Sequence, residues 1–225
     1  GDPHEAALKF PRRWARTGGD DKAEIVALRG SSHGRLFGSL AATDRPAYRL
    51  PFRPLAGGIS IVERDLNDIA AALDPATAAA VIAEPVQGEG GVRVLDHGFL
   101  RELRALTRER GAALILDEIQ CGLGRTGTFF AYEQAGIEPD ILTVAKPLAG
   151  GLPMGAVLMT DAIAGAIKPG DHGTTFGGGP FVASVASYVV GRLADPALLA
   201  HVRDTGAWFG RQLQEIAQRT GRIRG

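Results

Sequence analysis

Residues 112–118 read Ala-Ala-Leu-Ile-Leu-Asp-Glu, an unbroken apolar run that ends in two acids. Four to eight apolar residues closed by a polar group are typical of a strand that is buried on both faces. Two further runs of this kind are residues 78–83, which Glu84 follows, and residues 140–145, which Lys146 follows. The pattern therefore predicts a mainly parallel sheet.

Helices are predicted between these strands. The expected helices are residues 4–16, 64–74, 99–110, 181–193 and 196–219, and the other expected strands are residues 23–29, 57–63 and 156–160. Strands that alternate with helices indicate a three-layer α/β/α domain, in which helices cover both faces of the sheet. Such sheets bind ligands beyond the carboxyl ends of their strands, so the polar residues after the apolar runs are the first candidates for a site.

The composition excludes several classes of protein. Of the 225 residues, 45% are hydrophobic and 22% are charged, and the formal net charge is zero, which is typical of a soluble globular protein. A balanced charge gives no reason to expect nucleic acid or an anionic membrane as partner, and no apolar run reaches the ~18–20 residues of a membrane span. The single cysteine, Cys121, excludes an internal disulfide and predicts a reducing, cytoplasmic location.

Both ends of the sequence resemble cuts in a longer chain. Residue 1 is Gly rather than Met, and the first expected helix is under way by Glu5. The chain stops at Gly225, where another strand could begin. We therefore expect residues 1–225 to be an internal piece of a longer protein, long enough to form one large domain.

Lys146 is one of only four lysines, and it alone follows a predicted buried strand. Burial removes water from an amine and disfavours its charged form, and only the neutral amine attacks a carbonyl to form a Schiff base. Asp117 ends another predicted strand 29 residues earlier. A lysine for the aldehyde and a carboxylate for the pyridinium nitrogen are the protein groups that pyridoxal phosphate most needs. The pair therefore indicates a site for this cofactor.

Other motifs give weaker signals. The acidic end of the 112–118 run resembles the second acidic motif of a P-loop ATPase, but no Gly-Lys pair is present for a phosphate loop. The Gly-x-Gly-x-x-Gly of residues 122–127 does not stand at a strand-to-helix turn, so we interpret it as a glycine-rich loop. His33, His97 and His172 have no metal-ligand spacing to another His, Cys or carboxylate, so no metal is expected.

Eight short motifs follow one another along the chain. They are Glu5-Ala-Ala-Leu-Lys9, Ser32-His-Gly-Arg35, Glu84-Pro-Val-Gln-Gly-Glu-Gly-Gly91, Leu116-Asp-Glu-Ile-Gln120, Gly122-Leu-Gly-Arg-Thr-Gly127, Pro139-Asp-Ile-Leu-Thr-Val-Ala-Lys146, Gly150-Gly-Leu-Pro-Met-Gly155 and His172-Gly-Thr-Thr-Phe-Gly-Gly178. In this order they resemble a class III pyridoxal-phosphate-dependent aminotransferase of the acetylornithine and ornithine type. The resemblance covers essentially the whole chain. It implies the large domain of a fold-type I transferase, with residues 196–225 leading into a C-terminal small domain.

The resemblance also implies a role for named residues. Lys146 would bind the cofactor covalently and then move a proton, and Asp117 would pair with the ring nitrogen. Ile119 would pack on the ring, and Gln120 would bond its phenolic oxygen. The other implied contacts are Ser32, His33 and Glu84 around the cofactor, Thr175 on the phosphate of the neighbouring subunit, and Glu89 as the switchable partner of an arginine that binds the substrate carboxylate. The implied assembly is a homodimer with shared active sites.

The implied reaction moves an ω-amino group from N-acetylornithine, or a related diamino acid, to 2-oxoglutarate, giving the semialdehyde and glutamate. Other class III transaminases or aminomutases, acting on 4-aminobutyrate, amine and pyruvate pairs or glutamate-1-semialdehyde, remain alternatives. So does a fragment that folds or dimerises without turnover. Ser32 stands where the family has an aromatic residue on the cofactor ring, and His4 and Gly179 stand where it has asparagine. The missing aromatic contact predicts weaker cofactor binding.

Overall fold

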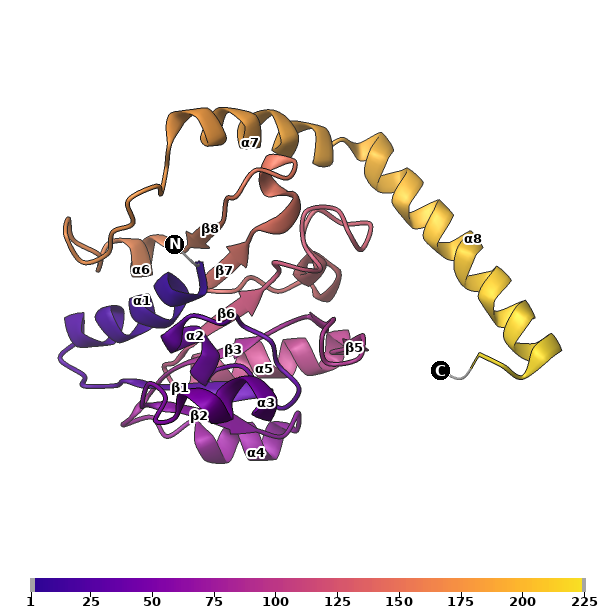
Figure 1. Ribbon diagram of the computed structural model, residues 1–225. Helices are drawn as coiled ribbons and strands as arrows, with labels where there is room; N and C mark the ends of the chain where they lie inside the picture. Colours follow the sequence, from indigo (N-terminus) through magenta and orange to yellow (C-terminus); the bar gives the residue numbers. More distant parts are fainter. Residues whose placement is uncertain (1–2, 224–225) are drawn as a thin grey trace.

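The computed structural model describes residues 3–223 and places a six-stranded sheet, in the order β2-β1-β3-β6-β7-β8, at the centre of these residues (Figure 1). The strands are β1 (Glu24–Leu28), β2 (Ile59–Val62), β3 (Ala78–Ala83), β6 (Ala113–Asp117), β7 (Ile141–Val144) and β8 (Ala156–Met159). All pairings are parallel except that of β8 with β7. The prediction of a mainly parallel sheet is confirmed. The sequence ends that resembled cuts, residues 1–2 and 224–225, lie outside the described residues.

Helices and short irregular elements connect the strands. The helices are α1 (Pro3–Thr17), α2 (Phe37–Ala41), α3 (Pro46–Arg49), α4 (Leu66–Ala72), α5 (His97–Glu109), α6 (Asp161–Ala164), α7 (Pro180–Leu193) and α8 (Pro196–Thr220). The 3-10 helices are η1 (Leu50–Phe52), η2 (Ala131–Ala135) and η3 (Lys146–Ala149), and β4 (Val86–Gln87) pairs with β5 (Arg93–Val94) in a small hairpin. Every predicted helix and strand lies within a few residues of an observed one.

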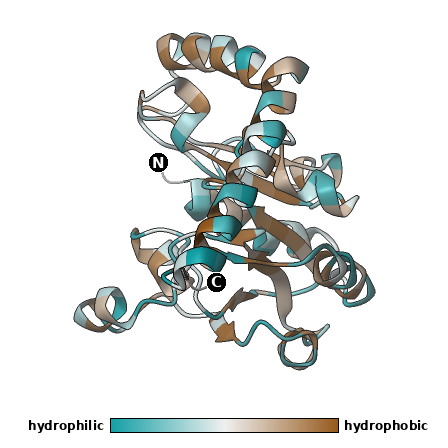
Figure 2. Cartoon of the chain, turned by 90° about the vertical axis from the view of Figure 1, so that its right-hand side faces the viewer, coloured by the Kyte–Doolittle hydropathy of each residue, from teal (hydrophilic) through white to brown (hydrophobic). Residues whose placement is uncertain are grey.

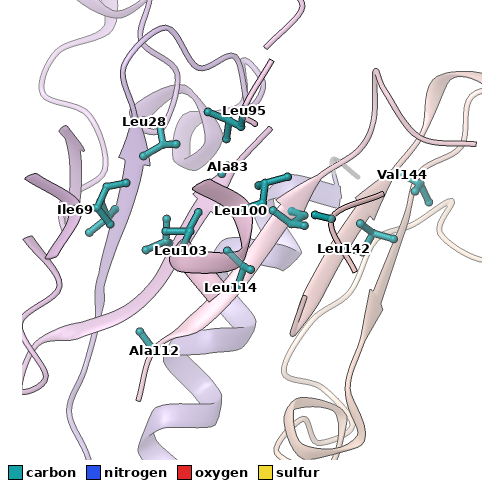
Figure 3. Packing of buried hydrophobic residues seen from close by; sticks show 14 of the residues in the cluster. Leu28, Ile69, Ala83, Leu95, Leu100, Leu103, Ala112, Leu114, Leu142 and Val144 are labelled. Carbon is teal, nitrogen blue, oxygen red and sulfur yellow. The ribbon is translucent and has the colours of Figure 1, made fainter. Parts of the chain in front are cut away.

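Each face of the sheet has its own core, because successive side chains of a strand point to opposite faces. On one face, Leu28 of β1 belongs to a buried cluster with Leu103 of α5 (Figure 3). On the other face, Ile25 of the same strand belongs to a second buried cluster with Leu8 of α1. The two clusters confirm the predicted three-layer α/β/α architecture.

Helix α7 packs against η3, and α8 extends away from the sheet (Figure 1). None of the 25 residues of α8 is buried, and α7 buries only Ala186. Figure 2 shows hydrophobic and hydrophilic residues mixed along α8. Among residues 3–223, no single helix is long and apolar enough to span a membrane; α7 and α8 meet that test only as a pair, which is bent by 61°.

Candidate active site

The carboxyl ends of β6 and β7 lie side by side at one edge of the sheet. The two strands are parallel neighbours, with Asp117 opposite Thr143. Strand β7 ends at Val144, and Lys146 follows as the first residue of η3 with a φ of 47°. A positive φ is uncommon for a residue other than glycine and often occurs at functional sites. The sequence predicted that Asp117 and Lys146 each close a buried strand, and the structure places these two strands side by side.

A cavity of about 430 Å³ opens at this edge. Lys146 lines it together with Ile119 and Gln120, which follow β6 directly. The Gln120 side chain lies against Gly88, where an added Cβ would come within 1.8 Å of the Gln120 Oε1. The fold thus brings together three of the residues that the sequence predicted around one cofactor.

The surroundings of Lys146 correct one expectation. The sequence predicted a lysine that strand burial would desolvate, but the Lys146 side chain is exposed. The reason is local: the buried strand stops at Val144, and the turn into η3 carries Lys146 out to the cavity. Burial in the strand is therefore not what prepares this amine for attack on a carbonyl.

Asp117 is buried, and four donors reach its carboxylate. Oδ1 accepts from the backbone N–H of Ile119 (3.2 Å) and the hydroxyl of Thr143 (2.9 Å). Oδ2 accepts from Nε2 of His4 (2.6 Å) and Nδ1 of His33 (2.8 Å). Burial alone would raise the pKa of Asp117, but the two histidines outweigh it and hold that pKa well below its usual range. The carboxylate therefore stays ionised at neutral pH.

His33 is fully buried, and its ring is hydrogen-bonded to Asp117. Its backbone N–H donates to Oγ1 of Thr43 over 2.9 Å, which fixes the residue in place. Its Nε2 has no hydrogen-bond partner among the described residues. The tautomer with a proton on Nδ1 and a bare Nε2 fits both observations.

Ser32 and Glu84 form a second contact nearby. The backbone N–H of the half-buried Ser32 donates to Oε1 of Glu84 over 2.9 Å. Glu84 is buried, and burial raises the pKa of its carboxyl group. The resemblance implied that Glu84 lies around the cofactor, and its hydrogen bond in the structure links it to the loop that carries Ser32.

His4, His33 and Asp117 also bring three ligand atoms within 4.8 Å of one another, although the sequence spacing gave no metal site. Two ligands of one tetrahedral zinc ion, at ~2.0–2.1 Å from it, lie ~3.3 Å apart. The contacts of Asp117 with the histidines, at 2.6 and 2.8 Å, are shorter than that and match hydrogen bonds. The three residues are arranged as a hydrogen-bonded cluster around a carboxylate.

Residues 2–225 match the family model described as aminotransferase class III. The chain belongs to the class III aminotransferases. It is 44% identical over 220 residues to a probable mitochondrial acetylornithine aminotransferase of Dictyostelium discoideum, a match that covers 96% of this chain and 49% of the relative. This class III chain thus spans about half the length of the curated relatives it matches.

Solved structures of the family share the fold. The ornithine aminotransferase of Toxoplasma gondii, whose active site held partially occupied pyridoxal phosphate, is 34% identical with a TM-score of 0.88 over 94% of this chain and 51% of its own. An amine transaminase of an uncultivated Pseudomonas species, in its pyridoxal-phosphate-bound form, is 29% identical with a TM-score of 0.91 over 100% of this chain and 58% of its own. The predicted fold-type I architecture is confirmed.

Two predicted site residues of this class III chain lie on exposed turns rather than in the Lys146 cavity. Glu89 lies in the turn between β4 and β5, with its side chain exposed. Thr175 is exposed in the loop before α7. Its neighbours Thr174 and Phe176 line a different cavity, of about 400 Å³. Their predicted roles, toward a substrate arginine and a neighbouring subunit, stay predictions.

The sequence analysis missed Arg125 and Thr126, which line the Lys146 cavity. Both lie in the Gly-x-Gly-x-x-Gly segment that we interpreted only as a loop. Gly124 and Gly127 have φ values of 89° and 92°, so they turn the loop in a way that residues with side chains rarely permit. The spacing of these glycines could have predicted that the backbone of this loop bends toward a ligand.

Proposed function

We propose that this chain is the cofactor-binding large domain of an enzyme that transfers an ω-amino group from N-acetylornithine, or a related diamino acid, to 2-oxoglutarate. The observation that carries the proposal is the Lys146 amine in one cavity with Ile119 and Gln120, at the strand edge where Asp117 is held ionised. The acetylornithine aminotransferases among its relatives support this class of donor.

The residues around the cavity suit pyridoxal phosphate. Lys146 offers an amine to the aldehyde, Ile119 an apolar surface to the ring, and Gln120 an amide donor to the phenolic oxygen. When bound, the cofactor withdraws electrons from the carbanion formed at the substrate carbon. The carboxylate of Asp117 favours the protonated ring nitrogen, which strengthens that withdrawal.

Besides holding the cofactor, the Nζ of Lys146 would remove and return the substrate proton. It is exposed to the cavity, and within the described residues it is the only lysine that lines this cavity. A base must come within hydrogen-bond reach of the proton that it abstracts. A substrate seated in this cavity would have to bring its proton within that reach of the Lys146 Nζ.

The exposed loop before α7 supports a homodimer with shared active sites. Phe176 and Phe181, on either side of Gly177–Gly179, are 90% and 72% exposed. Contiguous exposed apolar patches are typical of interaction surfaces, and we infer that these two side chains belong to one. Thr175 would offer its hydroxyl to the neighbouring subunit's cofactor phosphate, and Glu89 would face a substrate-binding arginine. Light scattering of the purified chain, with and without cofactor, measures whether the dimer forms.

The test of the proposed function is a turnover assay. Purified protein with pyridoxal phosphate, N-acetylornithine and 2-oxoglutarate should form glutamate, and the Lys146→Ala variant should form none above background. Glutamate formation at the same rate in both proteins would contradict the proposal. Lysine-dependent cofactor binding with no glutamate would support the alternative of a fragment without turnover.

An amine transaminase is the second candidate, because a solved amine transaminase has a TM-score of 0.91 with this chain. Its identity of 29% is lower than the 44% to the acetylornithine enzyme, which is why we rank it second. A donor panel separates the two: faster consumption of simple amines with pyruvate would favour it. The cytoplasmic location remains a proposal, and some relatives are named as mitochondrial.

A further inference from the structure

The carboxylate of Asp117 has no acceptor position left. An ionised carboxylate offers about four lone-pair sites, and four donors already use them. Two are Ile119 and Thr143 on Oδ1, and two are His4 and His33 on Oδ2. A pyridinium N–H that pairs with Asp117, as the proposed function requires, must therefore replace one of these donors.

Three of the donors are built into the fold. The N–H of Ile119 belongs to the backbone directly after β6, and Thr143 is a buried residue of β7 opposite Asp117. His33 is 0% exposed and is tied through its backbone to Thr43. Moving any of these would break the strand edge or the buried loop that forms the site.

His4 differs in its position. It is the second residue of α1, in the first turn of that helix, and it reaches Oδ2 from 113 residues away in the sequence. Its neighbour Pro3 lines the cavity of about 400 Å³ that Thr174 and the Gly177–Gly179 segment also line. The first turn of α1, which carries His4, therefore borders a cavity through Pro3. The His4 and His33 rings lie 5.9 Å apart and tilted by 59°, so they approach the shared oxygen from different directions.

We propose that His4 competes with the ring nitrogen of pyridoxal phosphate for Oδ2 of Asp117, so that the cofactor binds by displacing the His4 imidazole. The inference rests on the proposed function. Before cofactor binds, His4 supplies the buried Oδ2 with a second donor beside His33. When it binds, the pyridinium N–H takes over that hydrogen bond. His4 thus weakens cofactor binding, and His33 keeps its place in both states.

The first test compares His4→Ala with the control His201→Ala, which removes an exposed histidine of α8. Each protein is titrated with pyridoxal phosphate and with its 1-deaza analogue, in which carbon replaces the ring nitrogen. We expect His4→Ala to bind pyridoxal phosphate about tenfold more tightly, roughly the effect of one hydrogen bond to a charged group. The affinity for the analogue should not rise, and the control should match the wild type for both ligands.

The outcomes separate this inference from the proposed function. If both proteins bind pyridoxal phosphate equally well and through Lys146, His4 does not compete and only this inference fails. A weaker affinity in His4→Ala, or an equal gain for the analogue, also overturns it. If no protein forms a Lys146-dependent complex, the proposed function fails and takes this inference with it.

A second measurement uses the wild type, in case His4→Ala does not fold. Nitrogen-15 NMR resolves the ring N–H of each histidine, and the conservative His4→Gln variant assigns the His4 signal. Adding pyridoxal phosphate should move or abolish the signal of the His4 Nε2–H while the His33 Nδ1–H stays hydrogen-bonded. A His4 signal that is unchanged at saturation would overturn the proposal.

Discussion

The hydroxyl of Thr143 donates a 2.9 Å hydrogen bond to Oδ1 of Asp117, its direct partner across the parallel strands β7 and β6. Thr143 stands three residues before Lys146 on the chain. The bond therefore fixes the Asp117 carboxylate relative to β7, the strand that Lys146 follows. Asp117 ends β6 and Lys146 follows β7, so the fold holds both at the carboxyl ends of neighbouring strands.

Replacing Thr143 by valine should weaken both the fold and the site. Valine keeps the shape of threonine but leaves Oδ1 of the buried Asp117 without its hydroxyl donor. We expect the free energy of unfolding to fall by ~1–3 kcal/mol and cofactor to bind more weakly, measured by urea unfolding and by titration. Thr160→Val, at an exposed residue whose hydroxyl caps no helix, is the control. Equal stability of the two variants would show that the hydrogen bond from Thr143 to Asp117 does not stabilise the fold.

Gly88→Ala tests the placement of Gln120. The new Cβ would come within 1.8 Å of the Gln120 Oε1, and because this is the end of a flexible side chain, the amide should move while the fold remains. We expect unchanged thermal unfolding and a two- to tenfold rise in the dissociation constant of pyridoxal phosphate, about the effect of one lost hydrogen bond. In Gly57→Ala the new Cβ meets nothing within 4 Å, so both quantities should match the wild type. An unaltered dissociation constant in Gly88→Ala would remove Gln120 from the cofactor site.

Asp140→Asn should strongly destabilise the fold, although we assign Asp140 no role in the reaction. Both oxygens of Asp140 accept from the guanidinium of Arg104, and one also accepts from the backbone N–H of Leu114 over 2.8 Å. Because the Arg104 side chain is only 11% exposed, an unpaired guanidinium should lower the free energy of unfolding by ~3 kcal/mol or more.

The matched control for this ion pair is Asp21→Asn. Its partner Arg16 is 62% exposed and Asp21 itself is 91% exposed, so we expect a change within ~0.5 kcal/mol. Chemical unfolding of both variants at one pH gives the comparison. Similar losses in the two variants would mean that the buried pair does not anchor α5 to the sheet.

Glu118 should make stability depend on pH. Its carboxylate accepts from the backbone N–H groups of Ala131 and Tyr132, at 2.7 and 2.8 Å. Burial nevertheless raises its pKa from 4.5 to about 7. Between these two values the folded state binds a proton that the unfolded state has released, so the free energy of unfolding falls as pH rises from about 4.5 to about 7 and then levels off.

The measurement is urea unfolding of the wild type and Glu118→Gln at several pH values in this window. Each pKa unit of difference between the two states is worth about 1.4 kcal/mol. The neutral amide cannot titrate, so the variant should show a flatter profile than the wild type, whatever its absolute stability. Parallel profiles for the two proteins would show that Glu118 does not titrate there.

The sheet was predictable because its strands carry unbroken apolar runs that end in polar residues. Residues 78–83 form β3 as predicted, and β6 and β7 differ from their predicted runs by a residue or two. The short helices α2 and α3 were not predicted, since five and four residues are too few to show a helical period. An apolar run also does not show whether its strand pairs parallel or antiparallel, so the antiparallel pairing of β8 with β7 was not predicted.

The candidate site was only partly predictable, because it depends on contacts between distant segments. Asp117 ends β6, and Ile119 and Gln120 come after it, so their place at the same edge of the sheet as Lys146 comes from strand order. The approach of His4 to Asp117 joins residues 113 positions apart, and no local pattern reports it. The sequence analysis missed the exposure of Lys146 because this exposure depends on the positive φ of a single residue, Lys146 itself, which no sequence pattern reports.

The most direct test of the account is to trap the cofactor on the chain. Protein incubated with pyridoxal phosphate is reduced with borohydride, digested, and analysed by mass spectrometry to find which of the four lysines carries the adduct. The account predicts one reduced adduct, on the peptide that contains Lys146, and its loss in Lys146→Ala. An adduct spread over Lys9, Lys22 and Lys168, or none at Lys146, would contradict it.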